Sequence, residues 1–219
     1  MAEDDAGPPA RRERMLNLPP MVTTLIVVNV AVHVLRALLP DEADDALVNE
    51  LAFVPARFTV PGAFDWPALV SPVTYQFLHA GLAHLLINMT FVMAVGTAVE
   101  RYLGAWRTLA FSLICGVAAA ATHLAVYPQD AAALVGFSGA ASGQFAGALW
   151  TITRRSSGRS RGIRLVIVSA LWIASNVIFG IVGFPVGDAT PIAWVAHIGG
   201  YFSGLVLIGW FDPRRRWRV

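Results

Sequence analysis

Long apolar runs, separated by short polar segments, constrain this chain more than any other feature. Six runs are close to the length of about 17 to 25 residues that a helix needs to cross a bilayer. They cover residues 21–39, 82–99, 109–127, 138–153, 165–184 and 191–211. Of the 219 residues, 56% are hydrophobic and only 14% are charged, unlike soluble globular proteins. The sequence therefore predicts an all-α, polytopic membrane protein with six transmembrane helices in one bundle.

The arginines predict the orientation of these helices. All 16 positive charges are arginine, and most lie in clusters between the apolar runs, at 11–14, 101–107, 154–164 and 214–218. These clusters fall on one side of the membrane if both termini are cytoplasmic, in agreement with the positive-inside rule. We therefore expect a protein of the plasma (inner) membrane with both termini in the cytoplasm. Topology also explains the basic composition, so no nucleic acid partner is expected.

The chain divides into one membrane domain and two tails. Residues 1–20 are polar and proline-rich and predict a cytoplasmic tail, residues 21–211 form the membrane domain, and residues 212–219 form a basic cytoplasmic tail. A signal peptide is the competing interpretation of the N-terminus, but the first run is long enough to span the bilayer. The connection from Pro40 to Gly81 is rich in aromatic residues, and we expect it to lie partly in the outer interface.

A glycine-flanked serine stands where a loop is expected to become the fourth helix. The stretch from Val135 to Gly143 places Ser138 two residues after Gly136 and directly before Gly139. Glycines permit a tight corner there, and the free N–H groups of the first helical turn would stabilise an oxyanion beside the hydroxyl. Small residues in this pattern are also typical of packing between membrane helices. The stretch alone leaves both a nucleophile and a packing motif open.

A histidine in the last apolar run is expected at a similar depth. With Thr190 as the N-cap and Pro191 in the first turn, His197 lies about six residues, or ~9 Å, along the sixth helix. Ser138 begins the shortest run and lies about 6 Å below the outer boundary. Small residues recur every fourth position on both helices, at 139, 143 and 147 and at 196, 200 and 204. The two helices are therefore expected to pack closely enough for the hydroxyl and the imidazole to meet directly.

Further polar residues stand at the start of the second helix. His84 and Asn88 are four residues apart and share a face, and His79 lies just before them. His84 and Asn88 could donate hydrogen bonds to a developing oxyanion, and interhelical packing bonds explain them equally well at this point.

Other polar residues of the runs point to no further chemistry. His33, Arg36 and His123 have no obvious partners and are expected to be structural, while Glu100 and Arg101 are expected to anchor a cytoplasmic turn. Neither a zinc motif nor a carboxylate pair is visible, so no metal and no cofactor is expected.

With these residues in place, the chain resembles the rhomboid family of intramembrane serine proteases from about residue 21 to 211. Four ordered motifs carry the resemblance: His79-Ala-Gly-Leu-Ala-His84-Leu-Leu-Ile-Asn88, Glu100-Arg101-Tyr-Leu-Gly104, Gly136-Phe-Ser138-Gly139 and Ala196-His197-Ile-Gly-Gly200. The resemblance implies that Ser138 is the nucleophile and that His197 is its general base and then its general acid. It implies that His84 and Asn88 stabilise the oxyanion, with His79, Gly136 and Gly139 as structural residues near the site.

Two positions depart from the family pattern. Many members carry an aromatic residue four positions after the serine, on which the catalytic imidazole packs, but Ser142 stands here. Tyr201, one turn after His197, is the expected alternative support. The first loop of many members has a Trp-Arg pair, whereas Trp66 is followed by Pro67, so the anchoring of this loop is open.

We therefore expect an intramembrane serine endopeptidase that uses a Ser-His dyad to hydrolyse peptide bonds in or near transmembrane segments of membrane proteins. The site would open to the outer face, with the segment from Gly180 to Pro191 as a cap and the fifth helix as a lateral gate. Its partners would be transmembrane protein substrates and the lipid bilayer. A non-catalytic rhomboid-like protein that binds transmembrane helices is the alternative. A transporter is disfavoured because the chain has no internal repeat.

Overall fold

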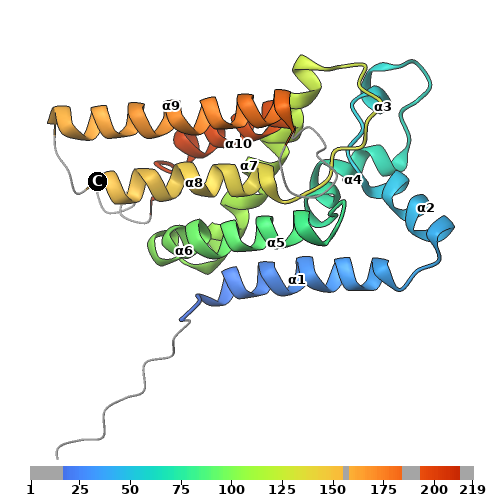
Figure 1. Cartoon of the computed structure of the whole chain (residues 1–219), viewed down its shortest axis with the longest axis horizontal. Coiled ribbons are helices and arrows are strands. Elements are labelled where there is room, and N and C mark those ends of the chain that lie inside the picture. Colours follow the sequence, from blue (N-terminus) through green and yellow to red (C-terminus); the bar gives the residue numbers. More distant parts are fainter. Residues whose placement is uncertain (1–16, 155–157, 184–192, 213–219) are drawn as a thin grey trace, which may run out of the picture.

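The computed structural model describes residues 17–154, 158–183 and 193–212, and these residues form a helical bundle (Figure 1). The described part contains no β-strand, only an isolated bridge between Phe53 and Leu134. The elements are α1 (Pro20–Ala37), α2 (Asp41–Leu51), α3 (Ala56–Thr59), α4 (Trp66–Thr74), η1 (Tyr75–Phe77), α5 (Leu82–Phe91), η2 (Val92–Gly96), α6 (Thr97–Leu103), α7 (Ala105–Val126), α8 (Ser138–Thr153), α9 (Gly158–Val182) and α10 (Trp194–Leu207).

Four helical segments in the described residues are long and apolar enough to cross a membrane. Three of them are α1, α7 and α9. The fourth is the continuous run from Leu82 to Leu103, which consists of α5, the π-helical η2 and α6. The other two expected spans correspond to shorter helices, with 16 residues in α8 and 14 in α10. At 1.5 Å per residue these reach only about 24 Å and 21 Å. The structure therefore confirms the all-helical fold and identifies four candidate spans by length and composition.

The helix that begins at Ser138 lies in the middle of the bundle. Helices α1, α5, α8 and α9 run roughly parallel in Figure 1, with α8 between α5 and α9. Most side chains of α8 are buried, because it also packs against α7 and α10. In contrast, Asn176 is the buried residue among the described side chains of α9. A surrounded α8 and a largely exposed α9 are consistent with α9 facing lipid.

Glycines set the distance between α8 and α10. A Cβ atom on Gly200 would collide with the carbonyl oxygen of Gly139, and one on Gly204 would collide with that of Gly143. Backbone therefore lies directly against backbone along this interface, as the four-residue repeat of small residues predicted. The contact brings the N-terminal turn of α8 next to the first turns of α10.

The start of α1 is held by a carboxylate from α6. The two oxygens of Glu100 accept hydrogen bonds from the backbone N–H groups of Met21 (3.0 Å) and Val22 (2.7 Å). These N–H groups have no acceptor within the helix, and a negative charge is favourable at this end. Glu100 therefore joins two helices, whereas the sequence had suggested only that it anchors a turn.

The connection between α1 and α5 contains α2, α3 and α4 rather than an irregular loop, and these helices gather at one end of the molecule (Figure 1).

The expectation that Arg36 lacks a partner was wrong. Its guanidinium binds both carboxylate oxygens of Asp44, at 2.7 and 2.9 Å, and the carbonyl oxygen of His79 at 2.8 Å. Hydrogen bonding from Arg36 is the main reason why the pKa of Asp44 lies below its usual value. Arg36 thus anchors the connection between α1 and α5, in which Trp66 is followed by Pro67 and not by an arginine.

Two other expectations from the sequence need correction. His123 does have a partner, since its Nε2 lies 3.3 Å from a carboxylate oxygen of Asp130. The sixth helix begins later than expected, at Trp194 with Ala193 as its N-cap, so His197 lies in the first turn of α10. Thr190 and Pro191, and with them most of the expected cap, lie outside the described residues.

Candidate active site

The hydroxyl of Ser138 and the imidazole of His197 meet directly. Ser138 is the first residue of α8 and His197 lies in the first turn of α10, and their Oγ and Nε2 atoms are 2.8 Å apart. The residues are 59 positions apart in the chain, and the glycine contact between the two helices brings them together. This distance is within the range needed for a serine and its general base.

The backbone before Ser138 is fixed by bonds to other elements. Gly136 has φ +119°, a region that favours glycine, and its N–H donates to the carbonyl oxygen of Tyr75 at 2.9 Å. The hydroxyl of Tyr75 in turn donates to the carbonyl oxygen of Gly116 in α7 at 2.7 Å. Phe137, between Gly136 and the serine, is fully buried. The corner that presents Ser138 is therefore tied to η1 and, through Tyr75, to α7.

The imidazole of His84 faces the same corner. A Cβ atom on Gly136 would come within 2.8 and 3.0 Å of the Cε1 and Nε2 atoms of His84, and within 3.7 Å of the Ser138 hydroxyl. His84 Nδ1 accepts a hydrogen bond from the backbone N–H of Ala80 at 3.4 Å. This bond leaves Nε2 as the protonated nitrogen, so His84 presents a donor toward the side of the serine.

Asn88 and His79 have different surroundings. The amide nitrogen of buried Asn88 donates to the backbone carbonyl of His84 at 2.9 Å, within the same helix. The ring of His79 lies edge-on to that of His84, with 5.2 Å between centroids. Burial lowers the pKa of His79 to about 3, so the ring is neutral. The structure thus brings Ser138, His197 and His84 together, and it places His79 behind His84.

Ser142 and Tyr201 do not support the ring of His197 as an aromatic neighbour would. The hydroxyl of Ser142 donates to the carbonyl oxygen of Ser138 at 2.8 Å. The ring of Tyr201 packs with aromatic residues of α8, α9 and α10, and its hydroxyl pairs with Ser169. Neither contact explains the orientation of the imidazole.

The sequence interpretation missed Asn176. Its Oδ1 lies 2.7 Å from Nδ1 of His197, so the imidazole has a partner on each nitrogen. Asn176 is 3% exposed and stands within the apolar run of α9. An amide inside an expected span is the only signal that could have drawn attention to it.

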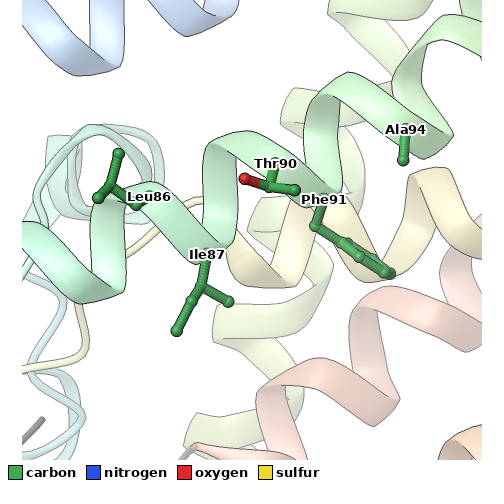
Figure 2. Close-up of a pocket in the computed structure, with 5 residues that line it drawn as sticks. All are labelled: Leu86, Ile87, Thr90, Phe91 and Ala94. Atoms are coloured by element: carbon green, nitrogen blue, oxygen red, sulfur yellow. The ribbon is translucent and has the colours of Figure 1, made fainter. Parts of the chain in front are cut away.

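An apolar groove runs along the outer face of α5 and its continuation (Figure 2). Its lining side chains are Leu86, Ile87, Thr90, Phe91 and Ala94. The ring of Phe91 stacks on that of Trp172 from α9, with 5.4 Å between centroids and 10° between planes. The groove thus lies beside the contact between α5 and α9.

In the described part of the chain, no group of three or more His, Cys, Asp or Glu side chains could hold a metal ion. The groups that the site offers are a partly buried hydroxyl, an imidazole with both nitrogens engaged, a second imidazole that donates, and the N–H groups of the first turn of α8.

Comparison with known proteins shows the family of this chain. The model of the rhomboid domain matches residues 68–214, which is more than half of the chain. Rhomboid protease GluP of Bacillus subtilis (strain 168) is 30% identical over 145 residues, covering 65% of this chain and 26% of that protein. RHOMBOID-like protein 7 of Arabidopsis thaliana is 30% identical over 158 residues, covering 67% of this chain and 46% of that protein.

A third relative aligns over more of the chain. Rhomboid protease GlpG of Yersinia enterocolitica serotype O:8 is 23% identical over 197 residues, covering 87% of this chain and 62% of that protein. The chain thus spans between about a quarter and three fifths of the length of these relatives. Members of this family are generally serine proteases, and two of the three relatives are named rhomboid proteases. The chain belongs to the rhomboid family.

Proposed function

We propose that this protein is an intramembrane serine endopeptidase that cleaves transmembrane proteins in or near their membrane segments. The observation that carries the proposal is the 2.8 Å contact between Ser138 Oγ and His197 Nε2 at the start of two helices. Its membership of a family of membrane proteases supports the same conclusion.

The dyad performs two proton transfers in each half of the reaction. His197 Nε2 takes the hydroxyl proton of Ser138 while Oγ attacks the scissile carbonyl carbon, and it then returns the proton to the leaving amine. The acyl group is left as an ester on Ser138. A water molecule attacks that ester, His197 takes one of its protons and gives it to Oγ, and the new carboxyl end is released.

The oxyanion of each tetrahedral intermediate is stabilised by donors around Ser138. The first N–H groups of α8 have no acceptor within the helix, and the positive end of the helix dipole lies there. His84 adds an imidazole donor next to Gly136. In this proposal Asn88 assists through the His84 carbonyl that it binds, and Gly136, Gly139 and His79 shape the site.

We propose that residues 21–211 form six spans, with tails at 1–20 and 212–219 in the cytoplasm. Helices α8 and α10 are short, but they lie against longer helices. In this proposal Ser138, at the start of the short α8, lies below the membrane surface, and the site opens to the outer face of the plasma (inner) membrane. A substrate segment enters between α5 and α9, along the apolar groove, and unwinds there to present its carbonyl.

The test is cleavage of a reporter transmembrane protein by the purified full chain in detergent or liposomes. The wild-type protein is expected to cleave, whereas Ser138→Ala and His197→Ala lose at least ~10³-fold in kcat. Persistent cleavage by Ser138→Ala would contradict the nucleophile. Binding of the reporter without cleavage by the wild-type protein would instead indicate the non-catalytic alternative.

A further inference from the structure

A serine–histidine pair works only with the imidazole in one tautomer. Nε2 of His197 must be unprotonated to accept the proton of Ser138, so Nδ1 carries the hydrogen and needs an acceptor. An unpaired Nδ1–H group in a buried site is costly, and a ring without a partner there is free to adopt the wrong tautomer.

Asn176 supplies that acceptor. Its Oδ1 lies 2.7 Å from Nδ1 of His197. The other end of the amide fixes which atom faces the ring, since Nδ2 donates to the carbonyl oxygen of Trp172 at 2.9 Å. A carbonyl oxygen can only accept, so the nitrogen must point toward Trp172 and the oxygen toward His197.

We infer that Asn176 is the positioning residue of the dyad, so that the reacting chain is Ser138–His197–Asn176. Asn176 accepts from Nδ1–H of His197, holds the ring in the plane that aims Nε2 at Oγ, and stabilises the imidazolium formed when Ser138 attacks. This inference rests on the proposed function, and it assigns to α9 a role in the chemistry.

Because Asn176 belongs to α9 and His197 to α10, the site is complete only while these helices are packed together. Other described side chains of α9 also contact neighbouring helices. Its Trp172 stacks on Phe91 of α5, and its Ser169 pairs with the hydroxyl of Tyr201. Outward movement of α9, which would admit a substrate between α5 and α9, breaks the Nδ1 contact. The histidine is then oriented for catalysis only after α9 returns.

The test compares three variants of the full-length protein in the reporter assay. Asn176→Ala removes the acceptor, Asn176→Asp keeps one, and Ser175→Ala is the matched control. Ser175 is adjacent on α9 and donates to the same Trp172 carbonyl at 2.8 Å, and it makes no described contact with His197. We expect Asn176→Ala to lower kcat about 10²-fold with KM within about twofold of wild type, and Ser175→Ala to match the wild type.

Asn176→Asp distinguishes a role in orienting the ring of His197 from a role in the stability of the fold alone. A carboxylate still accepts from Nδ1–H and favours the protonated imidazole, so kcat is restored to within about tenfold of wild type. The acid limb of the profile of kcat against pH then moves to higher pH. The inference is overturned if the kcat of Asn176→Ala equals that of Ser175→Ala, or if the kcat of Asn176→Asp is as low as that of Asn176→Ala. It is also overturned if Asn176→Ala changes only KM or the yield of purified protein.

A readout that does not need activity separates this inference from the proposed function. ¹⁵N NMR of His197 is recorded in two proteins, the inactive Ser138→Ala variant and the Ser138→Ala, Asn176→Ala double variant. The first is expected to show a protonated Nδ1 and an unprotonated Nε2, and the second a mixture of the two tautomers. The same tautomer in both proteins contradicts the inference. Failure of the wild-type protein to cleave, with the tautomer intact, contradicts only the proposed function.

Discussion

At the scale of single residues, Gly136 meets two requirements at once. Its φ of +119° is strained for any residue with a Cβ atom, and that atom would press against the ring of His84. Gly62 provides a comparison, because its φ is +79° and a Cβ atom there would meet nothing within 4 Å. The two glycines therefore share the backbone requirement, and only Gly136 faces the site.

Gly136→Ala is expected to lower kcat about 10²-fold, since it displaces a proposed oxyanion donor. Gly62→Ala is expected to cost about 1 to 2 kcal/mol of unfolding free energy from the same kind of backbone strain, and to leave kcat unchanged. Thermal unfolding and reporter cleavage of both variants provide the check. Equal effects of the two substitutions on kcat would show that His84 does not act at this corner.

The sequence was sufficient to predict which serine and histidine meet, but not what lies behind the histidine. Ser138 and His197 each lie in the first turn of a helix, and both helices carry small residues every fourth position, so their contact follows from local patterns. Asn176 lies in a helix that is apolar on all sides, so periodicity does not indicate its rotation. Its contact depends on how α9 packs, which is a property of the tertiary structure.

At the scale of elements, the interface of α8 and α10 determines the geometry of the dyad. Gly200 of α10 lies against the carbonyl oxygen of Gly139, one residue after Ser138, with no room for a methyl group. Gly200 is three positions after His197, so the two residues lie on adjacent turns of α10. Any widening of this contact moves the imidazole away from the hydroxyl.

Gly200→Ala is expected to lower the unfolding free energy by about 1 to 3 kcal/mol through overpacking. It should also lower kcat more than tenfold, because His197 moves away from Ser138. Gly162→Ala is the control, because a Cβ atom at Gly162 in α9 would meet nothing within 4 Å. That variant should be as stable as wild type or more stable, by up to about 1 kcal/mol. Full activity in Gly200→Ala would show that the α8–α10 contact does not set the dyad.

Element boundaries were predicted unevenly. The bounds of α8 match the fourth expected run, because Gly136 at one end and Arg154 at the other mark its limits. The start of α10 was placed too early, since Thr190 and Pro191 form a typical helix start. In the structure, Trp194 opens the helix and packs against Gly180 of α9. Local capping patterns do not reveal such a contact between two helices.

At the scale of the whole molecule, a surrounded central helix begins at Ser138, the proposed nucleophile. Helices α7 and α10 pack against α8, Glu100 ties the start of α1 to α6, and Arg36 ties the end of α1 to the segment before α5. The apolar runs predicted this general architecture. They did not reveal α2, α3 and α4, nor the role of Arg36, which depends on a hydrogen bond to the carbonyl oxygen of His79, 43 positions away.

Ser138 is proposed to be a nucleophile that is activated by His197 and reached from the outer face. The most direct test uses sealed, right-side-out vesicles of the full chain and a membrane-impermeant fluorophosphonate, with the adduct located by mass spectrometry. A tag at the N-terminus should resist external protease in the same vesicles, if the tails are cytoplasmic. An adduct on Ser138 is expected in the wild-type protein, and none in Ser138→Ala or His197→Ala. An adduct on another residue, undiminished labelling in His197→Ala, or labelling of Ser138 only after the vesicles are opened would contradict it.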